Sequence, residues 1–280
     1  MKARWTIAAG LGAMLAVSPA LAEEPSSEGL AKAAQNPVAD MISVPLQNNT
    51  NFQSGRYGST GNVLNVQPVV PFHLTEDWNL ITRTIIPILA MPRMSPAVHS
   101  AFGLGDINPT FFISPANPGG VIWGVGPTVS LPTATDKVLG TGKWSAGPAA
   151  VALIMPGSWV IGLLVNNMWS FAGDYNRKRV SQMTAQYFVN YNMPGGWYVT
   201  SSPVITANWV TQGRQWTVPF GGGVGRIFRI GEQPVNAQIA AYYNAIRQAD
   251  GAKWQLRAQL AFLFPTAKPK PMPGASAAPR

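Results

Sequence analysis

Residues 121–131 read VIWGVGPTVSL, and apolar residues alternate along this stretch with small or polar ones. One face carries Val121, Trp123, Val125, Val129 and Leu131, and the other carries Gly124, Gly126, Thr128 and Ser130. A period of two places successive side chains on opposite faces of a β-strand. The preceding Asn117-Pro118-Gly119 is typical of a tight turn. The stretch therefore predicts a strand whose two faces meet different surroundings.

The same pattern recurs from residue 41 to residue 264. Twelve strands are predicted, at residues 41–52, 61–74, 78–89, 105–114, 120–131, 144–155, 159–171, 181–193, 197–209, 215–228, 235–246 and 254–264. Most of them reach the roughly nine to eleven residues that a tilted strand needs to cross a bilayer.

The composition favours a membrane protein. Charged residues make up only 11% of the chain, against roughly 25% in soluble domains. Hydrophobic residues make up 46%, yet after residue 22 no apolar run reaches the roughly 18 residues of a membrane helix. A membrane β-barrel has this character, because lipid-facing and lumen-facing residues alternate. A soluble periplasmic sandwich or barrel is the alternative, since a one-sided sheet gives the same period.

The connections and the tryptophans add to this prediction. Short turns at residues 75–77, 117–119, 156–158 and 194–196 alternate with longer connections, as periplasmic turns alternate with outer loops. This alternation fades after residue 209. Tryptophans gather near the predicted strand ends, which is typical of interfacial girdles. They are Trp78, Trp123, Trp144, Trp159, Trp169, Trp197, Trp209, Trp216 and Trp254.

Prolines oppose the barrel interpretation. A closed barrel has no free edge where a missing N–H is harmless. Those inside or near predicted strands are Pro45, Pro68, Pro71, Pro87, Pro109, Pro127, Pro148, Pro203 and Pro219. We expect strand ends or bulges at several of these positions.

The flanking segments differ from the predicted barrel at 41–264. Residues 1–22 have a positive start, a short apolar stretch and an Ala20-Leu21-Ala22 cleavage signal, which predicts a secretory signal peptide. Residues 265–280 are rich in Pro, Ala and Lys and are expected to be disordered. After cleavage, the outer membrane is the expected location.

Residues 23–40 form an acidic segment with a predicted short helix at 27–35. Leu30, Ala33 and Ala34 give it an apolar stripe at helical spacing. Two hypotheses follow. The segment is either a mobile periplasmic leader, which its polarity favours, or a plug that enters the lumen and packs against Gly223 and Gly225.

Five stretches carry a resemblance to a known family. They are residues 36–39 (NPVA), 42–49 (ISVPLQNN), 105–107 (GDI), 131–135 (LPTAT) and 139–148 (LGTGKWSAGP). Together they resemble bacterial outer-membrane barrels labelled "transporter" or "neuromedin U", which lie near the barrel proteins of phenol meta-pathway degradation. The resemblance implies a barrel and solute passage, and it supplies no catalytic residues.

The inward faces of the strands predict the residues that line the lumen. They are Asn65, Gln67, His73, Arg83, Asp106, Gln182, Gln186, Asn190, Gly223, Gly225 and Arg257. Charged members should face inward, because charge in lipid is costly. The predicted outer loops carry an excess of Arg and Lys, which would attract lipopolysaccharide phosphates. The aromatic end of the last strand, Phe264, resembles the signal read by the barrel-assembly machinery, although the 16 residues that follow depart from that pattern. A nucleic-acid partner is not expected of an exported barrel.

Residues able to carry chemistry are few. Without cysteine and with two histidines, His73 and His99, the chain predicts no catalytic, metal or cofactor site. A lipid hydrolase would need His73 beside a serine such as Ser43 or Ser130. The sequence therefore favours a channel for small molecules, including hydrophobic or aromatic ones. A lipid hydrolase and a structural or adhesive barrel are the alternatives.

Overall fold

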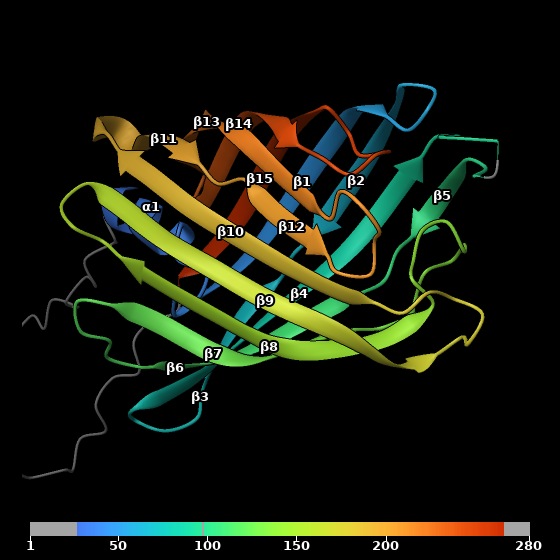
Figure 1. Ribbon diagram of the computed structural model, residues 1–280. Helices are drawn as coiled ribbons and strands as arrows, with labels where there is room; N and C mark the ends of the chain where they lie inside the picture. Colours follow the sequence, from blue (N-terminus) through green and yellow to red (C-terminus); the bar gives the residue numbers. More distant parts are fainter. Residues whose placement is uncertain (1–26, 97, 266–280) are drawn as a thin grey trace, which may run out of the picture.

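The computed structural model describes residues 27–265 except residue 97, and it forms a closed antiparallel β-barrel of twelve strands (Figure 1). Neighbouring strands pair in chain order, and pairing of β1 with β15 closes the barrel. The twelve-stranded prediction is confirmed. Among the described residues, no helix is apolar and long enough to cross a membrane.

Fifteen strand segments build the twelve strands, because three strands are interrupted. The unbroken strands are β1 (Met41–Ser54), β4 (Trp78–Met91), β7 (Ile122–Ser130), β8 (Lys143–Ile154), β9 (Trp159–Gly173), β10 (Ser181–Asn192), β13 (Trp216–Ile230), β14 (Gln233–Ile246) and β15 (Trp254–Pro265). The interrupted strands are β2 (Ser59–Val66) with β3 (Val69–His73), β5 (Ala101–Leu104) with β6 (Asn108–Pro115), and β11 (Trp197–Ser201) with β12 (Val204–Asn208).

The interruptions and irregularities explain how the barrel tolerates several of its prolines. Pro68 lies in the break between β2 and β3, and Pro203 lies in the break between β11 and β12. Pro219 follows a register shift between β13 and β14. Pro127 and Pro148 face each other across β7 and β8. The other prolines singled out in the sequence lie within paired segments, and they are Pro45, Pro71, Pro87 and Pro109.

From the loop 92–100 onward, longer connections at one end of the barrel alternate with shorter ones at the other. Short turns at one end include the 3-10 turn η1 (Pro194–Gly196) and the two-residue connection 231–232, where Gly231 has a φ of 61°. The other end carries the longer loops 92–100, 131–142, 174–180, 209–215 and 247–253. The expected fading of the alternation after residue 209 is wrong, because β13 and β14 run further toward each other than predicted. We call the two ends the turn end and the loop end.

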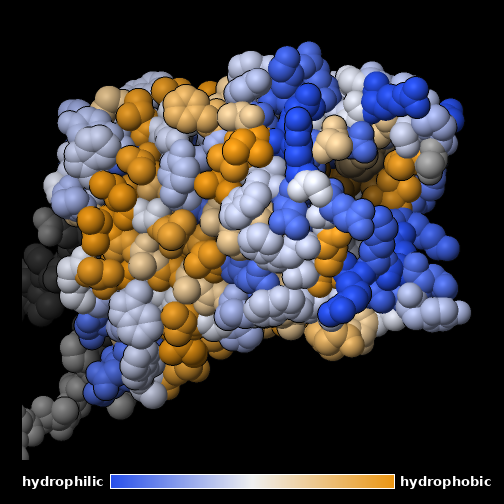
Figure 2. All heavy atoms as spheres, viewed as in Figure 1, coloured by the Kyte–Doolittle hydropathy of each residue, from blue (hydrophilic) through white to orange (hydrophobic). Residues whose placement is uncertain are grey.

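The outer surface matches a membrane environment. Figure 2 shows hydrophobic side chains over much of the barrel wall and hydrophilic ones gathered at the loop end. Aromatic pairs mark both ends. At the turn end, ring centroids lie 5.9 Å apart in Trp78–Trp123 and 4.8 Å apart in Trp159–Tyr191. At the loop end, the distances are 5.5 Å in Trp209–Trp216 and 4.7 Å in Tyr243–Trp254.

Helix α1 (Ser27–Ala34) lies inside the turn end of the barrel, behind β10 and β11 in Figure 1. Leu30 and Ala31 are only 4% and 2% exposed and pack against inward residues of β1, β11, β13 and β15. The favoured hypothesis of a mobile leader is wrong for this part of the segment, because its apolar stripe is buried. The predicted signal peptide and C-terminal tail lie outside the described residues, apart from Pro265.

Candidate functional site

A polar cavity lies inside the barrel on the lumen side of α1. Its volume is about 150 Å³, enough for roughly five water molecules at about 30 Å³ each. The lining comes from the chain around α1, from β1 and from seven other strand segments. It consists of Ala34, Gln35, Asn36, Pro37, Ser43, Pro45, Gln47, Gln67, Val69, Arg83, Leu164, Gln186, Phe188, Asn190, Tyr198, Thr200, Ser202, Asn236, Gln238, Arg257 and Gln259.

An apolar cluster closes the barrel between this cavity and the turn end. Inward side chains near the turn ends of β4, β6, β8, β9 and β10 pack together there, and Val38 joins them from the N-terminal segment. Phe112 and Ile81 are fully buried in it. The inner face is therefore largely apolar in this half of the barrel, whereas the predicted lumen-lining residues are mostly polar.

The N-terminal segment completes the closure through one specific polar contact. The Gln35 side-chain Nε2 donates to Asn192 Oδ1 at 2.9 Å, and Asn192 Nδ2 donates to Gln35 Oε1 at 3.3 Å. This amide pair joins the end of α1 to β10, on the side of the mouth opposite β1. Glu28 is exposed, so the buried contacts of the described helix are apolar rather than acidic.

Two arginines of the predicted set meet at the cavity, and neutral groups hold both. Arg83 Nη2 donates to Gln67 Oε1 at 2.7 Å. Arg257 is 2% exposed, and its Nε donates to Asn49 Oδ1 at 3.1 Å. Its Nη1 donates to Ser202 O at 2.9 Å, and its guanidinium carbon lies 5.0 Å from the centre of the Tyr242 ring.

Tyr198 forms part of the cavity wall in a way that only glycine permits. Its ring lies over Gly225, the residue that it faces in the register of β11 and β13. The Tyr198 hydroxyl then reaches across β13 and donates to Asn236 Oδ1 at 2.8 Å. Gly225 is therefore covered and does not line open space, which corrects the prediction. The residue of β13 that packs in the cluster around α1 is Ile227, not Gly223 or Gly225.

The remaining predicted lining residues are divided among several places. Gln67, Gln186 and Asn190 join the arginines at the cavity, whereas Gln182 lines a larger hollow at the loop end. Asn65 lies on the inner face of β2 opposite Gln47, and it is not among the cavity residues. Gly223 packs closely against the backbone of β14.

His73 lies near the turn end, beside Asp40. Its Nε2 lies 3.0 Å from Asp40 Oδ2, just before the start of β1. Ser43, one of the serines that a hydrolase would need, lines the cavity instead. Within the described residues no group of three or more His, Cys, Asp or Glu side chains could hold a metal ion.

Asp106 anchors a loop rather than lining the lumen cavity. Its Oδ2 accepts from Thr141 N at 2.6 Å and from Thr141 Oγ1 at 2.8 Å, and its Oδ1 accepts from Ala134 N at 3.3 Å. Thr133 Oγ1 accepts from Ile107 N at 2.9 Å. These bonds hold loop 131–142 against the break between β5 and β6.

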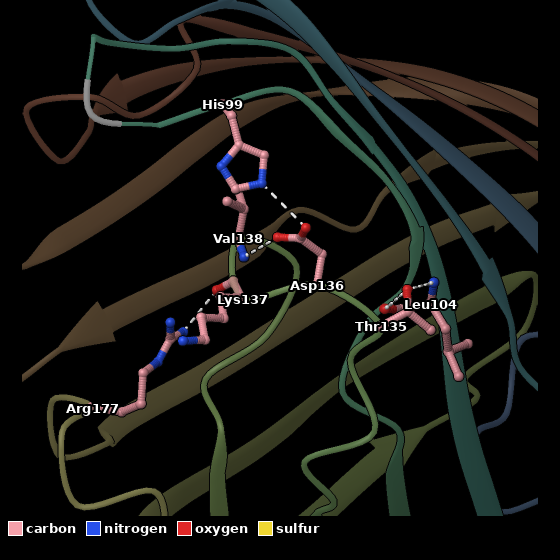
Figure 3. A network of polar contacts seen from close by, with 7 residues as sticks. All are labelled: His99, Leu104, Thr135, Asp136, Lys137, Val138 and Arg177. Atoms are coloured by element: carbon pink, nitrogen blue, oxygen red, sulfur yellow. Dashed lines mark hydrogen bonds and ion pairs between the residues drawn. The ribbon is translucent and has the colours of Figure 1, made fainter.

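Further contacts pin the same loop at the loop end (Figure 3). Arg177 donates to the carbonyl oxygens of Lys137, Thr141 and Gly140. His99 Nε2 lies 3.1 Å from Asp136 Oδ2. The Val138 N–H and His99 both hydrogen-bond the Asp136 carboxylate and hold its pKa below the ordinary value of 3.8.

A vestibule of about 1000 Å³ opens beside this loop. Arg177, Lys178 and Arg179 line it together with Gln182 and neutral loop residues. No carboxylate is among the described residues that line it. Three of the basic residues predicted for the outer loops therefore line this hollow.

Several cavity residues were missed by the sequence analysis. Asn236, Gln238 and Gln259 face the cavity from β14 and β15, and Asn49 of β1 accepts a hydrogen bond from Arg257. Their signal was present, because polar residues alternate with apolar ones at residues 236–240 and 255–259. Tyr198 carried no such signal, since an aromatic residue near a strand end suggests an outward girdle.

Comparison with known proteins gives a structural likeness only. No family model and no curated protein matches the chain. An outer membrane channel from Pseudomonas putida F1 is similar in structure, with a TM-score of 0.61 and 18% identity over 80% of this chain and 94% of that one. Outer membrane phospholipase A from Escherichia coli has a TM-score of 0.42 and 11% identity over 84% of this chain and 97% of that one.

The first of these likenesses shows a common fold, and the second is too weak to carry an argument. The barrel implied by the resemblance in the sequence agrees with this fold. The "neuromedin U" label and the link to phenol degradation stay expectations.

Proposed function

We propose that the protein is an outer-membrane channel or facilitator for small molecules and not an enzyme. The observation that carries the proposal is the polar cavity of about 150 Å³ enclosed by a barrel with an apolar exterior. A lumen lined by polar groups gives a solute a path through a hydrophobic barrier. The fold shared with an outer membrane channel from Pseudomonas putida F1 supports this function.

The closure at the turn end belongs to the proposal. Helix α1 and the cluster around Phe112 fill that end of the lumen, so the resting channel conducts weakly. The turn end faces the periplasm, because short turns lie on that side in outer-membrane barrels. The expected cargo is a small molecule, hydrophobic or aromatic ones included.

Purified protein in planar bilayers and in liposomes tests the function. Small, discrete conductance steps and passage of small solutes are expected. The matched control is the same barrel after heat unfolding, which should give neither. If the folded protein gives no current and no flux, both intact and without residues 24–38, the channel proposal is wrong. Lipid hydrolysis by the same preparation would favour the hydrolase.

A further inference from the structure

The starting observation is two positive charges inside the barrel, Arg257 buried and Arg83 partly buried, that have no negative partner among the described residues. Arg83 and Arg257 come from β4 and β15 and line the same cavity. In the described part of the chain, the ion pairs are His73–Asp40 and His99–Asp136, and neither involves these arginines. No Asp or Glu is among the cavity's described lining residues. Buried charges are ordinarily paired with an opposite charge, so an anionic ligand would complete this arrangement.

The neutral partners orient the arginines without cancelling their charge. Each guanidinium has five N–H donors. Arg83 donates one hydrogen bond to an amide, and Arg257 donates one to an amide and one to a backbone carbonyl. Both groups therefore keep donors for a ligand in the cavity of about 150 Å³ that they line.

An unsatisfied donor lies on the same cavity. Gln238 Nε2 is buried and has no hydrogen-bond partner among the described residues. The Tyr198 hydroxyl lies 3.3 Å from the carbonyl oxygen of that amide, but its single proton is already donated to Asn236 Oδ1 at 2.8 Å. The amide therefore keeps unused hydrogen-bonding capacity in the cavity wall.

The other part of the cavity wall is apolar. Val69, Leu164 and Phe188 line it and belong to the cluster that closes the turn end. The cavity therefore joins a cationic, donor-rich wall to an apolar wall. That combination suits a ligand with a charged head and a small apolar body.

We propose that this cavity binds a small organic carboxylate, with its carboxylate between Arg83 and Arg257 and its apolar body against Val69, Leu164 and Phe188. Arginine binds carboxylates through paired N–H···O bonds. Basic side chains in a pore select anions. The inference rests on the proposed channel function and names its substrate class.

The vestibule supplies the approach for such a solute. Lys178 and Arg179 line the hollow at the loop end, and Gln182 connects its lining with the inner face of β10. A cleft lined by one sign of charge raises the local concentration of the opposite ion. Anions therefore meet positive charge first at the mouth and again at the cavity.

Direct binding to the whole protein in detergent tests the site without requiring current. Benzoate is the probe, and benzamide is its neutral control of similar shape. Isothermal titration should show binding of benzoate and little of benzamide. The double variant Arg83→Gln/Arg257→Gln should bind benzoate about tenfold more weakly or worse, since charge-assisted bonds are lost. The control variant Arg226→Gln, which removes a cation lying over Trp197 on the exposed face, should bind as the parent does.

Each outcome decides the proposal. Equal affinity for benzoate and benzamide, no binding of benzoate, or an unchanged affinity in a folded double variant would overturn it. If the double variant does not fold, the benzoate–benzamide difference in the parent and its fall with rising salt decide instead. Ion selectivity separates the two proposals: a parent that conducts but prefers cations keeps the channel and removes the anion site.

Discussion

The turn half and the loop half of the barrel interior obey the same alternation but differ in the residues that they hold. In the turn half, inward positions carry Phe112, Ile81 and Phe188, which pack as a soluble core does. In the loop half, inward positions carry Asn49, Thr128 and Arg257. Thr128 bonds to Thr110 of β6, and Arg257 bonds to Asn49 of β1. Alternation determines which side chains point into the barrel. The residue types at those positions then determine whether apolar side chains fill the lumen or polar ones leave it open.

The two halves, which follow each other along the barrel axis, therefore have different roles. A packed apolar cluster excludes water and stabilises the fold, and a polar stretch with fixed donors discriminates among solutes. Stability should therefore depend most on the turn half, whereas selectivity and gating should depend on the loop half and on α1.

The largest expected effect is loss of stability in the turn half. Phe112→Ala removes a fully buried ring, and such changes cost about 3–5 kcal/mol. Phe220→Ala is the matched control, because that ring is 74% exposed on the outer face of β13 and little packing is lost. Urea unfolding of both variants in detergent, followed by tryptophan fluorescence, measures the difference. Equal stability of the two variants would show that the buried cluster of the turn half stabilises the fold no more than an exposed ring does.

The next effect concerns the closure by α1. Deleting residues 24–38, with the signal cleavage site kept, removes Leu30 and Ala31 from the mouth. Single-channel conductance should rise several-fold, because the mouth loses its filling. The point variant Gln35→Ala removes only the bond to Asn192 and should raise the frequency of brief openings instead. An unchanged conductance in a folded deletion variant would show that α1 does not restrict the lumen.

A smaller effect is expected at the loop anchor. Asp106→Ala removes the acceptor of three hydrogen bonds from loop 131–142. Because Asp106 is partly exposed and water can replace these bonds, the loss should be smaller than for Phe112→Ala. Trypsin should then cut the loop after Lys137 faster. Asp174→Ala is the control, because its carboxylate accepts a bond from Asn176 N within its own loop. Equal cleavage after Lys137 in both variants would remove the anchoring role from Asp106.

The smallest effect is a pH dependence of the same loop. The pKa of Asp136 is lowered in the folded protein, mainly by its bond from the Val138 N–H and then by His99. A lowered carboxyl pKa contributes stability that is complete above the ordinary value of 3.8 and is lost as the pH falls through the folded value. Loop-gating noise in bilayer recordings should therefore increase on acidification below that value. Asp136→Asn should show the noise at neutral pH, and a parent insensitive to acid would contradict the assignment.

Much of this architecture could be predicted from local pattern. The period of two, the turn residues and the tryptophans near strand ends gave twelve strands, and the inward positions of Gln67, Arg83, Gln186, Asn190 and Arg257 followed from it. The misplaced residues failed for local reasons. Asp106 lies in a break between β5 and β6, where alternation stops, and Gly225 is covered by a ring from the neighbouring strand.

By itself, the sequence determined the number of strands, the face on which each side chain lies and the basic character of the loop end, because these depend on spacing along the chain. The tertiary structure alone decided which inward residues meet. Closing the barrel brings β4 and β15 to one cavity, so that Arg83 and Arg257 share it, and folds α1 into the turn end. Those outcomes depend on register and on contacts between strands far apart in the chain. The local period of two along each strand carries no information about them.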